Sequence, residues 1–97
     1  MLEEYKSFLS TLTRLSREEE EALWKQYKEE GLLEARKSII EHYQPLVFRE
    51  AMKYGLQEAV TLDLIQEGTV GLMESVERFR PSLGVVVLDN GLPGLQK

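Results

Sequence analysis

Apolar side chains recur at steps of three and four residues along most of this chain, and this spacing constrains the fold more than any other feature. The longest series contains Leu32, Ala35, Ile39, Tyr43, Leu46, Val47, Ala51 and Tyr54. Because an α-helix turns once every 3.6 residues, such a series lines one face of a helix. The sequence therefore predicts an all-α fold, a small bundle of about four helices. The length of 97 residues leaves room for one small domain.

The first two helices are delimited by apolar spacing and by capping residues. Apolar residues predict a first helix over residues 2–13. Ser16 and Glu19 have the spacing of a capping box, in which the side chain of each residue bonds the backbone N–H of the other. A second helix is therefore expected to begin after Ser16 and to end at Gly31.

Two further helices are expected in the second half of the chain. The long apolar series predicts a third helix over residues 32–54. Pro45 lies inside it and cannot donate a helical hydrogen bond, so a kink or a break is expected there. Thr61 is expected to cap a fourth helix that runs to Phe79, before Pro81 stops it.

The chain changes character after Pro81. A short β-branched run, Val85 to Val87, is followed by turn-forming residues. A lone strand cannot build a sheet without a partner strand, so an irregular C-terminal tail is expected. The sequence thus divides into a helical domain, residues 1–80, and a tail, residues 81–97.

Composition excludes several classes of function. The chain has 12 Lys and Arg against 17 Asp and Glu, a net charge of −5, which argues against broad binding to a phosphate backbone. It has no cysteine, which excludes disulfides and thiolate metal sites. The first residues lack the pattern of a signal peptide and no apolar stretch could span a bilayer, so a cytoplasmic location is expected.

The fourth expected helix has two unlike sides. Its core side is expected to carry Leu62, Ile65, Thr69, Leu72, Val76 and Phe79. Its outward side is expected to carry Asp63, Gln66, Glu67, Val70, Glu74 and Glu77. An acidic outward side is most often a solvated surface, and periodicity alone leaves that interpretation open beside one of partner binding. Gly68 and Gly71 inside the helix indicate close approach of a neighbouring backbone.

Residues 62–81, LDLIQEGTVGLMESVERFRP, closely resemble the polymerase-docking helix of bacterial sigma factors of the primary and flagellar types. Upstream, residues 15–20 and 35–41 and the pair Leu46 and Val47 are similar to the preceding segments of that family. The resemblance covers residues 15 to about 84 and implies a role in transcription initiation.

The resemblance also implies a partner and a binding site. In the family this helix binds a coiled coil of the largest RNA polymerase subunit through its outward polar face. Thr69 stands where the family usually has Asn, which shortens one polar side chain. Carboxylates and an amide suit the Arg and Lys of a basic partner helix, while affinity would come from buried Leu62 and Met73. The implied polymerase-binding residues are Leu62, Asp63, Gln66, Glu67, Thr69 and Met73.

The resemblance ends near Gly84. Family members continue there with a Phe, a Thr-Tyr-Ala run and a helix rich in Trp, Arg and Lys that opens and reads the promoter, whereas the only Trp of this chain is Trp24. Stacking aromatic rings and basic side chains are what single-stranded DNA binding requires. The chain is therefore expected to be a truncated or frameshifted fragment, with promoter DNA as a partner only in a full-length family member.

The expected truncation has a second consequence. A missing next helix would leave Leu72, Val76 and Phe79 partly uncovered, so a homodimer through exposed apolar surface is a further hypothesis.

An enzyme is the weakest alternative. His42 is the only histidine, no catalytic residues are indicated, and no cofactor is expected. Asp63, Gln66 and Glu67 lack the Glu-x-x-His pairing of carboxylate metal sites, so no metal is expected. Two rivals stay open: a generic helical protein-interaction module, and a competitor of full-length sigma factors.

Overall fold

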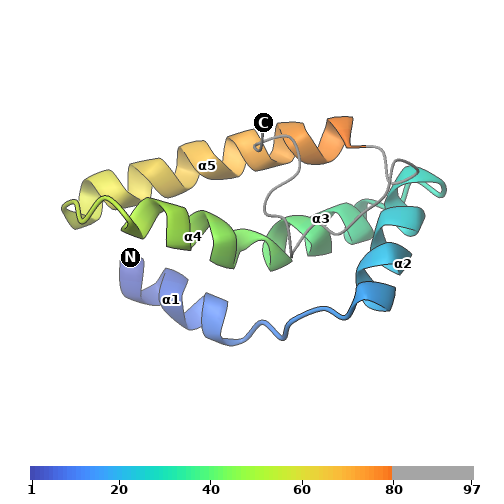
Figure 1. Cartoon of the computed structure of the whole chain (residues 1–97), viewed down its shortest axis with the longest axis horizontal. Helices are drawn as coiled ribbons and strands as arrows, with labels where there is room; N and C mark the ends of the chain where they lie inside the picture. The colour runs from blue at the N-terminus through green and yellow to red at the C-terminus, as the bar shows by residue number, and fades with distance from the viewer. Residues whose placement is uncertain (80–97) are drawn as a thin grey trace.

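The computed structural model of the chain describes residues 1–79, which form helices and no strands (Figure 1). The helices are α1 (Leu2–Ser10), α2 (Arg17–Lys28), α3 (Leu33–His42), α4 (Gln44–Met52) and α5 (Glu58–Arg78). The predicted all-α bundle is confirmed, with five helices in the described part because the third expected helix is divided in two. The expected tail, residues 81–97, lies outside the described residues.

The expected capping box at the start of α2 is confirmed. The Ser16 hydroxyl accepts from the backbone N–H of Glu19 at 3.0 Å, and the Glu19 carboxylate accepts from the backbone N–H of Ser16 at 2.8 Å. After α2 the chain turns at Gly31, whose φ of 71° lies in the left-handed region that favours glycine. The Gly31 N–H donates to the carbonyl of Tyr27, as is usual where a helix ends.

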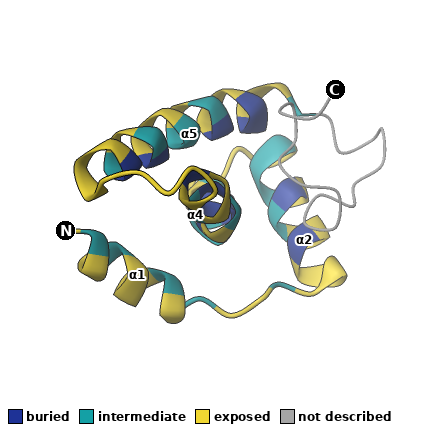
Figure 2. Cartoon of the chain, turned by 60° about the vertical axis from the view of Figure 1, so that its left-hand side comes forward, coloured by how far each residue is buried: buried dark blue, intermediate teal, exposed yellow. Residues whose placement is uncertain are grey.

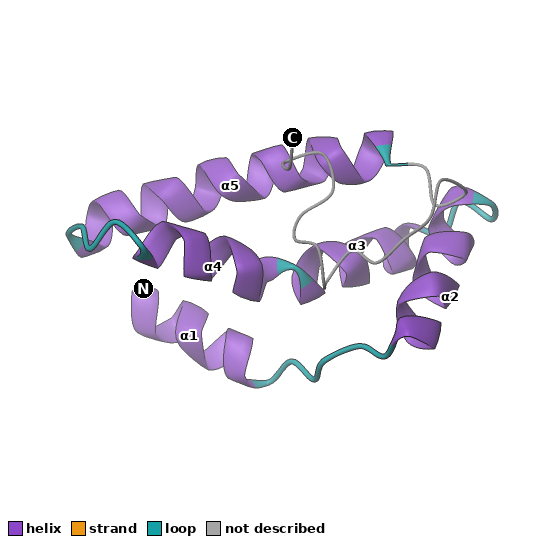
Figure 3. Ribbon diagram, viewed as in Figure 1, coloured by secondary structure: helices purple, strands orange, loops and turns teal. Residues whose placement is uncertain are grey.

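The expected break at Pro45 is also confirmed. α3 ends at His42, Tyr43 lies between the helices, and α4 begins at Gln44 with the proline in its first turn (Figure 3). Proline is tolerated there because the first N–H groups of a helix have no helical acceptor.

Thr61 does not cap α5, and that prediction was wrong. α5 begins at Glu58, and the N–H of Thr61 already donates to the carbonyl of Gln57 at 2.9 Å. The buried Thr61 hydroxyl donates to the carbonyl of Leu56 at 3.3 Å instead of accepting from an N–H. The first helix likewise ends early, at Ser10, and the Thr11 hydroxyl donates to the carbonyl of Phe8 there.

The core contains one carboxylate among its apolar side chains. Glu20 is 6% exposed and accepts from the Tyr43 hydroxyl at 2.8 Å and from the Trp24 ring N–H at 3.4 Å. Burial, with the carboxylate beside it, raises the pKa of Tyr43. These hydrogen bonds tie α2 to the turn between α3 and α4, and the buried sides of the helices face one another (Figure 2).

Gly68 allows α5 to lie close to α4. A Cβ added at Gly68 would lie 3.0 Å from Cγ1 of Val47, and Val47 is buried and β-branched, so it has little freedom to move. Gly68→Ala is therefore expected to lower the free energy of unfolding by about 1 kcal/mol, because the overpacking cost exceeds the gain in helix propensity. Urea denaturation measures this difference.

A double-mutant cycle provides the control for this prediction. In a Val47→Ala background the obstructing methyl group is gone, so Gly68→Ala is expected to become neutral or stabilising there. The same destabilisation by Gly68→Ala in both backgrounds would contradict the close contact.

Candidate functional site

α5 is the longest described helix, and it lies against α4 along one side of the molecule (Figure 1). Its inner side is buried and carries Thr61, Ile65, Leu72, Ser75 and Val76. Its opposite side carries the exposed residues, and a helix of 21 residues completes roughly six turns. The helix therefore presents a long, rigid outer surface.

The middle of this outer surface is acidic with an apolar component, and we term it the acidic face. It consists of Asp63, Gln66, Glu67, Val70, Met73 and Glu74, all of them exposed. No ion pair or side-chain hydrogen bond within residues 1–79 engages Asp63, Gln66 or Glu67. Val70 is 56% exposed and Met73 is 38% exposed, so apolar surface lies among the acceptors. Such a face can accept hydrogen bonds from cationic side chains while apolar groups are buried against it.

The two nearest carboxylates of the acidic face repel each other. Asp63 and Glu67 are one turn apart on the helix, and like charges at this spacing destabilise a helix by about 0.2–0.5 kcal/mol. A cationic partner would relieve this repulsion, because its charge would be attracted by both carboxylates.

The structure places most of the six predicted binding residues on this side of α5. Asp63, Gln66, Glu67 and Met73 are exposed, and Leu62 is half-buried where it packs against the core. Thr69 differs, because its hydroxyl is held within the chain, 2.8 Å from the carbonyl of Ile65 and 3.3 Å from Oε1 of Gln44.

Gln44 links three helices in an arrangement that the sequence analysis missed. Its buried amide oxygen accepts from the Tyr5 hydroxyl at 2.7 Å and faces the Thr69 hydroxyl, so it joins α1, α4 and α5. Burial raises the pKa of Tyr5 to about 12. No sequence signal identifies this contact, since Gln44 lies in the first turn of a helix where polar residues are usually solvated.

Glu77 lies on the exposed side of α5, as the helical periodicity predicted, but its carboxylate has partners and is not part of the acidic face. Its carboxylate accepts from the Arg36 guanidinium at 2.9 Å and from the Tyr27 hydroxyl at 3.0 Å, and its backbone carbonyl accepts from Lys28 at 2.7 Å. The reason is that α2 and α3 reach the C-terminal end of α5 and supply donors there. Glu77 therefore anchors α5 to the other helices.

The pKa of the Glu77 carboxyl lies below its ordinary value of 4.5, chiefly because Arg36 donates to it. A lowered pKa contributes stability above 4.5 that is lost as the pH falls through the folded-state value. Glu77→Gln is therefore expected to lower the melting temperature at pH 7, and the difference from wild type is expected to vanish in acid. Thermal melts from pH 7 to 2 measure it. A difference that stays constant with pH would contradict an ionic anchor.

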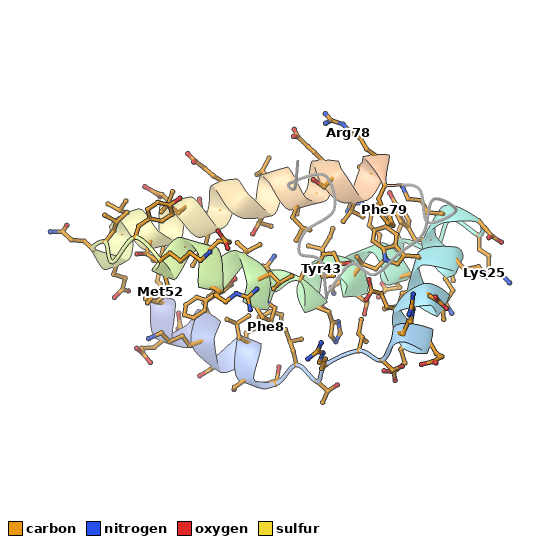
Figure 4. All side chains as sticks on the ribbon, in the orientation of Figure 1. Phe8, Lys25, Tyr43, Met52, Arg78 and Phe79 are labelled. Carbon is orange, nitrogen blue, oxygen red and sulfur yellow. The ribbon has the colours of Figure 1, made fainter. Side chains whose placement is uncertain are left out.

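The apolar surface expected at the end of α5 is absent, and that prediction was wrong. Leu72 and Val76 are fully buried in the core, and the Phe79 ring lies 4.6 Å from the Trp24 ring. In Figure 4 Phe79 points toward α2 while Arg78 points away from the bundle. Trp24 of α2 covers Phe79, and the common core of the bundle covers Leu72 and Val76, so these residues offer no apolar surface for self-association.

Comparison with known protein families identifies the family to which the chain belongs. Residues 39–87 match the model of sigma-70 region 2, which spans the end of α3, all of α4 and all of α5. The chain belongs to the sigma-70 family. Members of this family are transcription initiation factors that bind RNA polymerase and are not enzymes. The match extends past Gly84, where the resemblance was expected to end, to residue 87.

Two further observations accompany the membership in the sigma-70 family. The acidic face lies wholly inside the matched segment, on α5. No helix within residues 1–79 is long and apolar enough to cross a membrane. Residues 15–38 precede the matched segment, and their similarity to the family stays a prediction.

Proposed function

We propose that this sigma-70 family chain docks on the coiled coil of the largest RNA polymerase subunit through the acidic face of α5, with Leu62 and Thr69 at its edge. The observation that carries this proposal is the exposure of Asp63, Gln66 and Glu67 without partners inside the described chain. A solvated acidic surface needs no apolar groups, whereas Val70 and Met73 lie exposed among the acceptors. This mixture supports binding over solvation alone.

Charged and apolar contacts contribute differently to the proposed docking. The carboxylates of Asp63 and Glu67 attract Arg and Lys of the coiled coil, which raises the rate of encounter and sets the register of the two helices. Burial of Met73, Val70 and the edge of Leu62 supplies affinity, because apolar surface removed from water contributes about 25 cal/mol per Å². Docking is therefore expected to weaken with added salt without being lost.

We further propose that residues 81–97 neither open nor read the promoter. This segment contains one Lys and no Phe, Tyr or Trp. Single-stranded DNA is bound by aromatic stacking and basic side chains, and the segment has almost none of either. Residues 1–97 therefore act in docking on the polymerase, in the cytoplasm, and do not themselves bind promoter DNA.

A transcription assay tests this function. Added to core polymerase alone, the chain is expected to give no promoter-specific run-off product. Added to a reaction that contains a full-length sigma factor, it is expected to reduce product as its concentration rises, because both proteins occupy the same coiled coil. Promoter-specific product from the chain alone, or undiminished product at saturating chain, would contradict the proposal. The second result would favour a generic interaction module.

A further inference from the structure

A hollow of about 310 Å³ is lined by residues of the connection between α1 and α2 and of the junction of α3 and α4. This connection runs on the side of the molecule opposite α5 (Figure 1). Its apolar wall is formed by Leu12, Leu15, Pro45 and Leu46. Its volume is at the low end of the range of about 300–1,000 Å³ for ligand sites, so it accommodates one or two side chains and not a whole helix.

The charge around this hollow is opposite to that of the protein. Arg14, Arg49 and His42 line it, and none of the described residues that line it is acidic, although acidic residues outnumber basic ones in the chain. His42 is oriented by its Nδ1, which lies 2.8 Å from the carbonyl of Ser38. A cationic rim over an aliphatic wall is therefore a local feature that the overall charge does not explain.

Arg49 is the side chain that gives the rim an available positive charge. The neighbouring Glu50 carboxylate accepts from Lys53 at 2.8 Å, and its pKa is lowered chiefly by Lys53 and also by the charge of Arg49. No ion pair or hydrogen bond of Arg49 is found within residues 1–79. Arg14 already takes part in another interaction. It adds positive charge to the rim, but Arg49 is the residue expected to contact a bound carboxylate. An exposed guanidinium beside apolar surface suits a carboxylate, which it can bind through two hydrogen bonds.

We propose that this hollow binds an acidic amphipathic peptide segment of a partner protein, with a Leu or Phe side chain against Leu12, Leu15 and Leu46 and an adjacent Asp or Glu paired with Arg49. Single-stranded nucleic acid fits less well, because the described residues that line the hollow include no Phe, Tyr or Trp, and their one aromatic ring, the His42 imidazole, is held by the Ser38 carbonyl. This site is separate from the acidic face and does not depend on the proposed docking.

The test uses the full chain and a short fluorescent peptide that carries Leu on one face of a helix and Glu beside it. In a second peptide each Glu is replaced by Gln. Fluorescence anisotropy is expected to show saturable binding of the acidic peptide. Arg49→Glu is expected to weaken it about tenfold, since a favourable charge contact becomes a repulsive one, and the Gln peptide is expected to bind similarly weakly. Circular dichroism checks that the variant remains folded.

Two variants separate the hollow from general charge effects. Arg17 is exposed, pairs with Glu21 and does not line the hollow. Arg17→Glu makes the same change in net charge as Arg49→Glu, and it is expected to leave the affinity for the peptide unchanged. Glu67→Lys alters the acidic face and is likewise expected to leave it unchanged. The proposal is overturned if the acidic peptide shows no saturable binding, or if Arg49→Glu leaves its affinity unaltered. It is also overturned if Arg17→Glu lowers the affinity as much as Arg49→Glu does, or if single-stranded oligothymidine binds more tightly than the peptide.

Discussion

Glu67→Lys is expected to weaken docking on the polymerase coiled coil by at least about a hundredfold while leaving the bundle as stable as before. The loss follows because like charges placed together at an interface cost several kcal/mol, and 1.4 kcal/mol corresponds to a factor of ten in the dissociation constant. The helix itself is not harmed, since Glu67 is exposed and has no partner within residues 1–79. A lysine there converts the repulsion with Asp63 into attraction worth about 0.3 kcal/mol.

Two measurements on the same samples check this result. Isothermal titration with a purified coiled-coil fragment gives the dissociation constant, and thermal melting followed by circular dichroism gives the stability. Glu30→Lys is the matched control, because it makes the same charge change at an exposed position that is not part of the acidic face. An affinity unchanged by Glu67→Lys, or an equal loss with Glu30→Lys, would show that the acidic face has no specific part in docking.

Trp24→Ala is expected to lower the free energy of unfolding by about 3–5 kcal/mol, the largest loss of stability among the changes considered for this chain. Trp24 is fully buried, its ring lies against Phe79, and its ring N–H donates to the buried Glu20 carboxylate. The substitution leaves a cavity and removes one hydrogen bond from a buried charge. Native proteins have total stabilities of about 5–15 kcal/mol, so this loss is a large fraction of the total.

Urea denaturation at 25 °C measures this loss, and a second aromatic residue supplies the control. Tyr54 is 66% exposed, so Tyr54→Ala is expected to change the free energy of unfolding by less than about 0.5 kcal/mol. A loss below about 1 kcal/mol for Trp24→Ala would mean that the contacts of α2 with the rest of the bundle contribute little to the fold.

Features that depend on neighbours in the sequence could be predicted from the sequence alone. The capping box needs only Ser16 and Glu19 at the right spacing, and the break between α3 and α4 needs only the missing N–H of Pro45. The exposure of Asp63, Gln66 and Glu67 followed from helical periodicity. The same stretch, residues 62–81, also carried the family resemblance.

Features that depend on contacts between helices could not be predicted in this way. Glu20 belongs to a run of four glutamates, and only the positions of Tyr43 and Trp24 in space show which of the four is buried. Glu77 lies on the outward stripe of a helical wheel, yet Arg36 and Tyr27 from other helices hold it. Periodicity identifies a face of a helix, but it does not identify the donors that another helix brings to that face.

Nuclear magnetic resonance of the isotope-labelled chain, titrated with the polymerase coiled-coil fragment, tests the docking proposal most directly. The predicted result is that backbone amide shifts change along the exposed side of α5, at Asp63, Gln66, Glu67, Val70 and Met73, and stay unchanged around Arg49. Shifts confined to other helices, or no shifts at saturating fragment, would contradict the proposal that the acidic face is the polymerase-binding surface.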